Sequence, residues 1–202
     1  MDYYRNIVTE KSWRILQELR KDYQFVLIGG WAVWLYAHAF KSKDIDIIVD
    51  MKTLTKIKMK FPVTKNNRLC KYEAVEGEVQ IDIYVPYWSN LGIPAEKIQS
   101  HAITREGFRV PPPETLLVLK QVAYSARAGS SKGYKDFLDM INLISLPQFN
   151  WKHYQTVTNH ILVKQLPAVL SHTTHLPELG LNAHQLAKKK KEWLNALENF
   201  KA

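Results

Sequence analysis

Two aspartates separated by a single residue inside an apolar strand constrain this chain more than any other feature. The segment KSKDIDIIVD holds Asp44 and Asp46 among isoleucines and a valine. Because successive side chains of a β-strand point to opposite faces, Ile45 and Ile47 share one face and the two aspartates share the other. A buried carboxylate is costly unless a cation pairs with it. The segment is therefore expected to join a sheet with one apolar face and one face that carries chemistry.

The same alternation recurs in EVQIDIYV, residues 78–85, where Asp82 lies between isoleucines. If the two strands are neighbours, three carboxylates converge, and a divalent cation among them relieves their mutual repulsion. Ligands that are all oxygen select a hard ion, Mg²⁺ or Mn²⁺. Asp44, Asp46 and Asp82 are therefore predicted to be metal ligands.

A glycine pair, Gly29 and Gly30, lies between an apolar strand pattern at 25–28 and a helical pattern that starts at residue 32. Glycine lets the backbone N–H groups of a strand-to-helix turn approach an anion closely, and a helix N-terminus attracts negative charge. A glycine pair alone is more often only a tight turn. Followed by the aspartates, it indicates a phosphate-binding turn.

The order of the expected elements gives an α/β N-terminal half and a helical C-terminal half. Three consecutive prolines at 111–113 separate the two halves. We therefore predict a mixed β-sheet with flanking helices over 1–110 and a helical domain over 111–202. The elements expected before the prolines are helices near 3–20, 32–40 and 51–60 and strands near 25–28, 41–50, 68–75, 78–85 and 108–110.

Charge and cysteine content narrow the class of protein. The 202 residues carry a formal net charge of +9, which favours an anionic partner such as a nucleic acid or a nucleotide. Seven lysines or arginines and no acidic residue occupy 51–72, which is either solvated surface or a polyanion-binding segment. No apolar run reaches membrane-spanning length, and the N-terminus is expected to be an amphipathic helix rather than a signal peptide. The single cysteine, Cys70, allows no internal disulfide and favours a cytoplasmic location.

The motifs LIGG at 27–30, DID at 44–46 and QIDIY at 80–84 resemble the signature of the polymerase-β-type nucleotidyltransferase superfamily. The segment GGWAVWLYAHAFKSKDIDIIV is also similar to the opening of aminoglycoside-type nucleotidyltransferases. Residues 110–144 resemble the helical region of AbiEii-like and MenT-like toxins, with a lysine, an arginine and then KDxxD. The resemblance implies a nucleotidyltransferase fold, ATP or another nucleoside triphosphate as substrate, and metal-dependent transfer of the nucleotidyl group to a hydroxyl.

Lys120 interrupts the apolar run LLVLKQVA. A lysine in this position either extends its ammonium to solvent or points it at an anion. The resemblance favours the second interpretation, so we expect Lys120, together with Lys135 and Asp136 of the next helix, to bind the nucleotide with Gly29 and Gly30. The alternative for the acidic residues of that helix is a solvated face with local ion pairs.

The acceptor of the nucleotide is left open by the sequence. The candidates are an RNA such as tRNA, a partner protein of a toxin–antitoxin pair, and a small hydroxylated molecule of the aminoglycoside kind. A different class is a non-catalytic module that binds a nucleotide or RNA. The complete set of three aspartates argues against that class.

Overall fold

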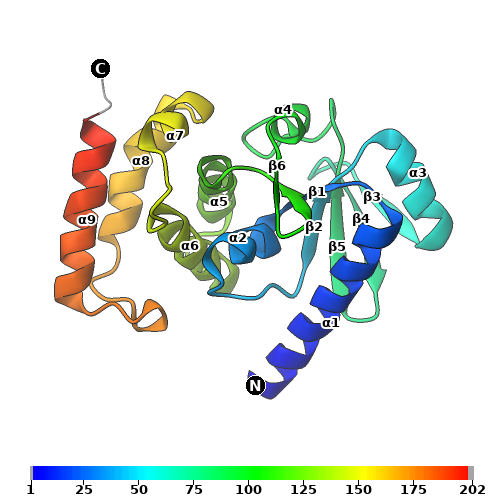
Figure 1. Ribbon diagram of the computed structural model, residues 1–202, viewed down its shortest axis with the longest axis horizontal. Coiled ribbons are helices and arrows are strands. Elements are labelled where there is room, and N and C mark those ends of the chain that lie inside the picture. The colour runs from blue at the N-terminus through cyan, green and yellow to red at the C-terminus, as the bar shows by residue number, and fades with distance from the viewer. Residues whose placement is uncertain (1, 200–202) are drawn as a thin grey trace.

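A seven-stranded mixed sheet forms the centre of the N-terminal half in the computed structural model, which describes residues 2–199, and the C-terminal helices extend to one side of it (Figure 1). The strands are β1 (Val26–Ile28), β2 (Ile45–Ile48), β3 (Val63–Asn66), β4 (Lys71–Glu76), β5 (Val79–Tyr84), β6 (Ile103–Arg105) and β7 (Phe108–Val110). Their order in the sheet is β3-β4-β5-β2-β1-β7-β6. Strand β2 is antiparallel to β1 and parallel to β5. The predicted α/β architecture is confirmed.

The prolines separate the helices that lie among the strands from those that follow, as expected. The last strand ends at Val110, and a helix begins at Pro113. The helices among the strands are α1 (Asp2–Asp22), α2 (Gly29–Ala37), α3 (Met51–Lys60) and α4 (Ala95–Ser100). Those that follow are α5 (Pro113–Arg127), α6 (Ser131–Ile144), α7 (Trp151–Val157), α8 (His160–Ser171) and α9 (Ala183–Glu198), with a 3₁₀ turn at Pro177–Leu179. Within residues 2–199, no helix combines the length and apolar character needed to cross a membrane.

The register of β2 against β5 gives the sheet its two different faces. Asp46 lies level with Asp82, and the isoleucines on either side of each aspartate are also paired across the two strands. These isoleucines are buried in the core. Strand β4 extends the carboxylate face, because Glu73 lies opposite Asp82. The predicted alternation of an apolar face and a carboxylate face is confirmed.

Helix α3 carries four of the seven basic residues of segment 51–72, and it lies on the apolar face of the sheet. Lys58 Nζ is 4.6 Å from the ring centre of Tyr72, which is paired with Ile83 and therefore points away from Asp82. Leu54 and Ile57 of the same helix are buried. The lysines of α3 are thus on the side of the sheet opposite the carboxylates.

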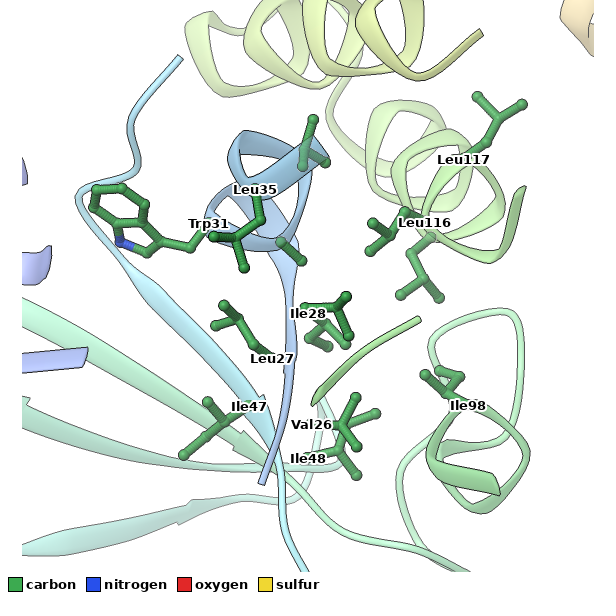
Figure 2. Close-up of a cluster of buried hydrophobic side chains, with 14 of the residues drawn as sticks. Val26, Leu27, Ile28, Trp31, Leu35, Ile47, Ile48, Ile98, Leu116 and Leu117 are labelled. Carbon is green, nitrogen blue, oxygen red and sulfur yellow. The ribbon is translucent and has the colours of Figure 1, made fainter. Parts of the chain in front are cut away.

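The helical half shares its core with the sheet through α5. Figure 2 shows Leu116 of α5 and Ile98 of α4 facing Val26 and Ile28 of β1. All four side chains are buried. The structure therefore packs the two halves around one continuous apolar core, and the division into domains at 110/111 stays a prediction.

Several details differ from the sequence-based expectation, and one is helix α4, which forms within a segment expected to be a loop. The edge strands β3 and β6 were not predicted, because neither VTKN nor ITR alternates apolar and polar residues clearly. The glycine pair does not separate β1 from the helix: α2 begins at Gly29, and Ile28 is its N-cap residue. The glycines therefore form the first turn of α2, where backbone N–H groups have no partner within the helix.

Candidate active site

A pocket of about 770 Å³ lies where the carboxylate face of β2 and β5 meets α5 and α6. Its lining includes Asp44, Asp46 and Asp82, so the structure brings the three predicted carboxylates to one pocket. Seven lysine or arginine residues and four aspartates line it, an excess of three positive charges. A site with this excess favours a polyanionic ligand.

The three aspartates differ in their partners. Asp82 accepts from Lys71 Nζ at 2.6 Å and from Gln80 Nε2 at 2.8 Å. Asp44, in the bend just before β2, contacts Lys132 Nζ at 3.2 Å. Asp46 makes no ion pair within residues 2–199, and burial, with the nearby Asp82 carboxylate, raises its pKa to about 6. Asp46 is thus the carboxylate whose charge is least compensated.

The oxygen donors of this pocket fit Mg²⁺ when a nucleotide completes the coordination. Within residues 2–199, no three His, Cys, Asp or Glu side chains already converge to hold a metal ion together. The carboxylates of Asp46 and Asp82 are neighbours across two parallel strands, and Asp46 lacks a cation. Mg²⁺ is usually bound by one or two protein carboxylates, with substrate phosphates and waters as the other ligands. The carboxylates of Asp46 and Asp82 match this usual coordination of Mg²⁺.

The glycine turn faces Asp46 and Lys135 at close range. Gly29 has φ +67, and a Cβ added there would clash with Asp46 Oδ2. A Cβ at Gly30 would lie 2.8 Å from both Lys135 Nζ and Ser42 Oγ. The backbone of this turn is therefore open to the pocket only because both residues lack a side chain.

Lys135 of α6 is a largely desolvated cation that makes no ion pair within the described chain. Burial lowers its pKa, and Lys120 adds to that effect, whereas Asp139 opposes it. Its ammonium points across Gly30 into the pocket. A buried amine without a carboxylate partner is available to an anion.

Lys120 lines the pocket, but its ammonium already has two buried carboxylate partners. Lys120 Nζ is 3.1 Å from Asp136 Oδ1 and 2.6 Å from Asp139 Oδ2. Arg127 contacts the other oxygen of Asp136 at 2.7 Å. Burial works against the charge of Lys120, yet Asp139 and Asp136 raise its pKa. Contact of Lys120 or Asp136 with a nucleotide stays a prediction, since the geometry alone assigns both residues to an ion-pair network between α5 and α6.

We expect Lys120→Met to destabilise the protein by about 3–5 kcal/mol, because it leaves two buried carboxylates without their cation. Urea unfolding of the metal-free protein measures the change. Lys164→Met, on the exposed face of α8, is the matched control and should change the free energy of unfolding by less than about 0.5 kcal/mol. Equal stability of wild type and Lys120→Met would contradict the buried network. A loss of activity in Lys120→Met has meaning only at temperatures where that variant is folded.

Sequence reasoning missed Lys71 and Glu73 of β4, which extend the site beyond Asp82. Lys71 Nζ bridges Asp82 Oδ2 and Glu73 Oε1, at 2.6 Å and 2.9 Å. The signal was present in the alternation of KYEA, where both charged residues fall on one strand face and Tyr72 and Ala74 on the other. Only the pairing of β4 with β5 shows that this face is the carboxylate face.

Among the comparisons with known proteins, only the comparison with solved structures gives matches. A scan against protein-family models and a sequence search of curated proteins give no match. Among solved structures, a protein from H. pylori assigned as a nucleotidyltransferase is 18% identical, with a TM-score of 0.54, and the match covers 96% of each chain. JHP933 from Helicobacter pylori is also 18% identical, with a TM-score of 0.53, over 96% of this chain and 94% of that one.

A third solved structure widens the comparison. The antibiotic-resistance factor ANT(2'')-Ia is 14% identical, with a TM-score of 0.53, and the match covers 85% of this chain and 97% of the other. At these identities the likeness shows the fold. It confirms the nucleotidyltransferase fold that the sequence motifs implied, and it includes the helical half of the chain.

Proposed function

We propose that this chain is a metal-dependent nucleotidyltransferase that moves a nucleotidyl group from a nucleoside triphosphate to a hydroxyl acceptor. The observation that carries the proposal is the position of Asp46 level with Asp82 on adjacent strands. Beside them lies the glycine turn, where the Lys135 ammonium is close to Gly30 and makes no ion pair in the described chain. The nucleotidyltransferase fold is independent support. Phosphoryl and nucleotidyl transfer depend mainly on positioning and charge stabilisation, which such a pocket can supply.

Each part of the pocket has a role in this proposal. The N–H groups at the start of α2 and the Lys135 ammonium would bind the triphosphate, where negative charge grows as pyrophosphate departs. Asp44, Asp46 and Asp82 would hold Mg²⁺ or Mn²⁺, which when bound neutralises phosphate charge and makes a hydroxyl more acidic. Lys71 and Lys132 would release Asp82 and Asp44 as the metal and nucleotide enter.

The acceptor would approach over β4 and β3, where the carboxylate face of the sheet continues away from Asp82. Thr64 of β3 is exposed and Asn66 is partly exposed on this side. The lysines of α3 lie on the other face, whereas Lys71 of the same basic segment lines the pocket. The segment therefore gives less reason to favour RNA over a small molecule. An RNA such as tRNA, a partner protein of a toxin–antitoxin pair and an aminoglycoside-like molecule all stay candidates, as does a cytoplasmic location.

One observation favours a second candidate, a module that binds a nucleotide without transferring it. Asp82 and Asp44 are each paired with a lysine, so two of the three carboxylates have a cation without any metal. A binding module could keep these pairs permanently. An enzyme would have to break these two ion pairs so that the carboxylates can bind the metal.

Incubation with labelled nucleotides separates the two candidates. The purified chain is mixed with each α-labelled nucleoside triphosphate, Mg²⁺ and either total RNA, a cell-protein extract or an aminoglycoside mixture. We expect label in one acceptor fraction, release of pyrophosphate, and loss of both when EDTA is added. Saturable nucleotide binding with no pyrophosphate release in any mixture would instead identify the binding module.

A further inference from the structure

A second pocket, of about 600 Å³, lies on the other side of α5 from the carboxylates. Its walls are α4 with the loop before it, the start of α5, and α7 with the two residues that follow it. Thr115 of α5 lines this pocket and Lys120 lines the first, and five helical residues place these two side chains on different sides of the helix. Figure 1 shows α4, α5 and α7 as separate segments, with α5 lying between α4 and the outer helices. The second pocket is therefore a distinct site of small-molecule size.

The ionisable side chains that line the second pocket are all basic: Lys97, His101 and His153 line it, and neither Asp nor Glu does among the described residues. His101 Nδ1 is 2.8 Å from the Lys97 carbonyl oxygen, which can only accept, so Nδ1 carries a hydrogen. Its Nε2 is left for a ligand, and it donates to an anion when the ring is protonated. His153 Nδ1 is 3.4 Å from Thr156 Oγ1, which likewise leaves its Nε2 uncommitted. These groups suit an anion.

Hydroxyl and apolar groups complete the lining. Thr158, just after α7, lines the pocket, and its hydroxyl is buried beside the Tyr154 hydroxyl. The neighbouring Tyr154 hydroxyl donates to Gln121 Oε1 at 2.7 Å. Ile93, Ile98 and Val157 supply an apolar wall beside these polar groups.

We propose that the second pocket binds a small molecule that has an apolar body and one anionic group, a phosphate or a carboxylate. The anionic group lies between Lys97 and the two imidazoles, and the body contacts the isoleucines and Val157. The volume, the basic character of every ionisable lining residue in the described chain, and the adjoining apolar wall together carry this assignment. It does not depend on the proposed transfer activity, since neither histidine lines the carboxylate pocket.

Titration of the full chain without divalent ions tests the proposal. The probes are inorganic phosphate, AMP and benzoate, which present a phosphate alone, a phosphate with a ring, and a carboxylate with a ring. The readout is the imidazole ¹H–¹³C signals of His101 and His153, assigned with His101→Gln and His153→Gln. We expect both signals to shift saturably with AMP or benzoate, and more weakly with phosphate alone.

Lys97→Met should weaken the binding about tenfold, the loss of one charge-assisted contact. Lys152→Met is the matched control: this exposed lysine precedes His153 on α7 and does not line the pocket, so affinity should stay unchanged. The proposal is overturned if no probe shifts the two imidazoles saturably, or if the control weakens binding as much as Lys97→Met. Tighter binding of a single-stranded oligonucleotide than of every probe would also overturn it, in favour of a nucleic-acid surface.

Discussion

Asp46→Asn is expected to lower nucleotidyl transfer by about 100- to 1000-fold or more while the fold is kept, because it removes the least compensated carboxylate of the pocket. Asparagine retains the size and one oxygen of aspartate, so loss of packing does not explain such an effect. Initial rates of pyrophosphate release with Mg²⁺ measure it. Asp22→Asn, at the exposed end of α1, is the control and should leave the rate unchanged. Wild-type rates in Asp46→Asn would end the assignment of this carboxylate to catalysis.

The same substitution should increase stability in the absence of divalent ions. Burial and the Asp82 carboxylate raise the pKa of Asp46 from 3.8 to about 6 in the folded protein. The folded state therefore holds a proton that the unfolded state has released, and stability falls as the pH rises from about 4 to 6. Asp46→Asn avoids this loss, so its advantage in the free energy of unfolding should be about 3 kcal/mol at pH 7 and nearly absent below about pH 4. Urea unfolding at the two pH values checks the sign, and an advantage that is the same at both would contradict the raised pKa.

The carboxylate face could be predicted from the sequence because it depends on a period of two residues. Asp46 and Asp82 alternate with isoleucines in the sequence itself, so their faces were known once the strands were recognised. That the two strands are adjacent and in register was a further assumption, which the pairing confirms. The strand order depends on tertiary packing, which local pattern does not contain.

The partners of the lysines could not be predicted for the same reason. Lys120 is sixteen residues from Asp136 in sequence, and their contact requires α5 and α6 to pack as a hairpin. Sequence reasoning had two environments for Lys120, solvent and a phosphate, whereas the structure gives it a third, a buried pair of carboxylates. In the sequence, Lys135 lies beside Asp136, and nothing there distinguishes its environment from that of Lys120. That Lys135 has no carboxylate partner follows only from the structure, in which its ammonium lies beside Gly30.

Lys135→Met is expected to weaken triphosphate binding about 10- to 100-fold, because the buried ammonium beside Gly30 makes no ion pair in the described chain and is available to the phosphates. Methionine keeps most of the apolar stem and removes the charge. Calorimetric titration with a non-hydrolysable nucleoside triphosphate and Mg²⁺ measures the affinity. Unchanged affinity for analogues of all four bases would remove Lys135 from the nucleotide site.

The stability of Lys135→Met should change in the direction opposite to its affinity. Burial lowers the pKa of Lys135, which means that its charge opposes folding at neutral pH. Removing the charge should therefore leave the metal-free protein at least as stable as wild type. Lys120→Met makes the same chemical change one helix away and should lose stability, since its cation compensates Asp136 and Asp139. Urea unfolding of the two variants under the same conditions distinguishes a lysine that stabilises the fold from one whose charge is available to bind a ligand. If Lys135→Met were the less stable of the two, Lys135 would have a structural partner and the phosphate role would fail.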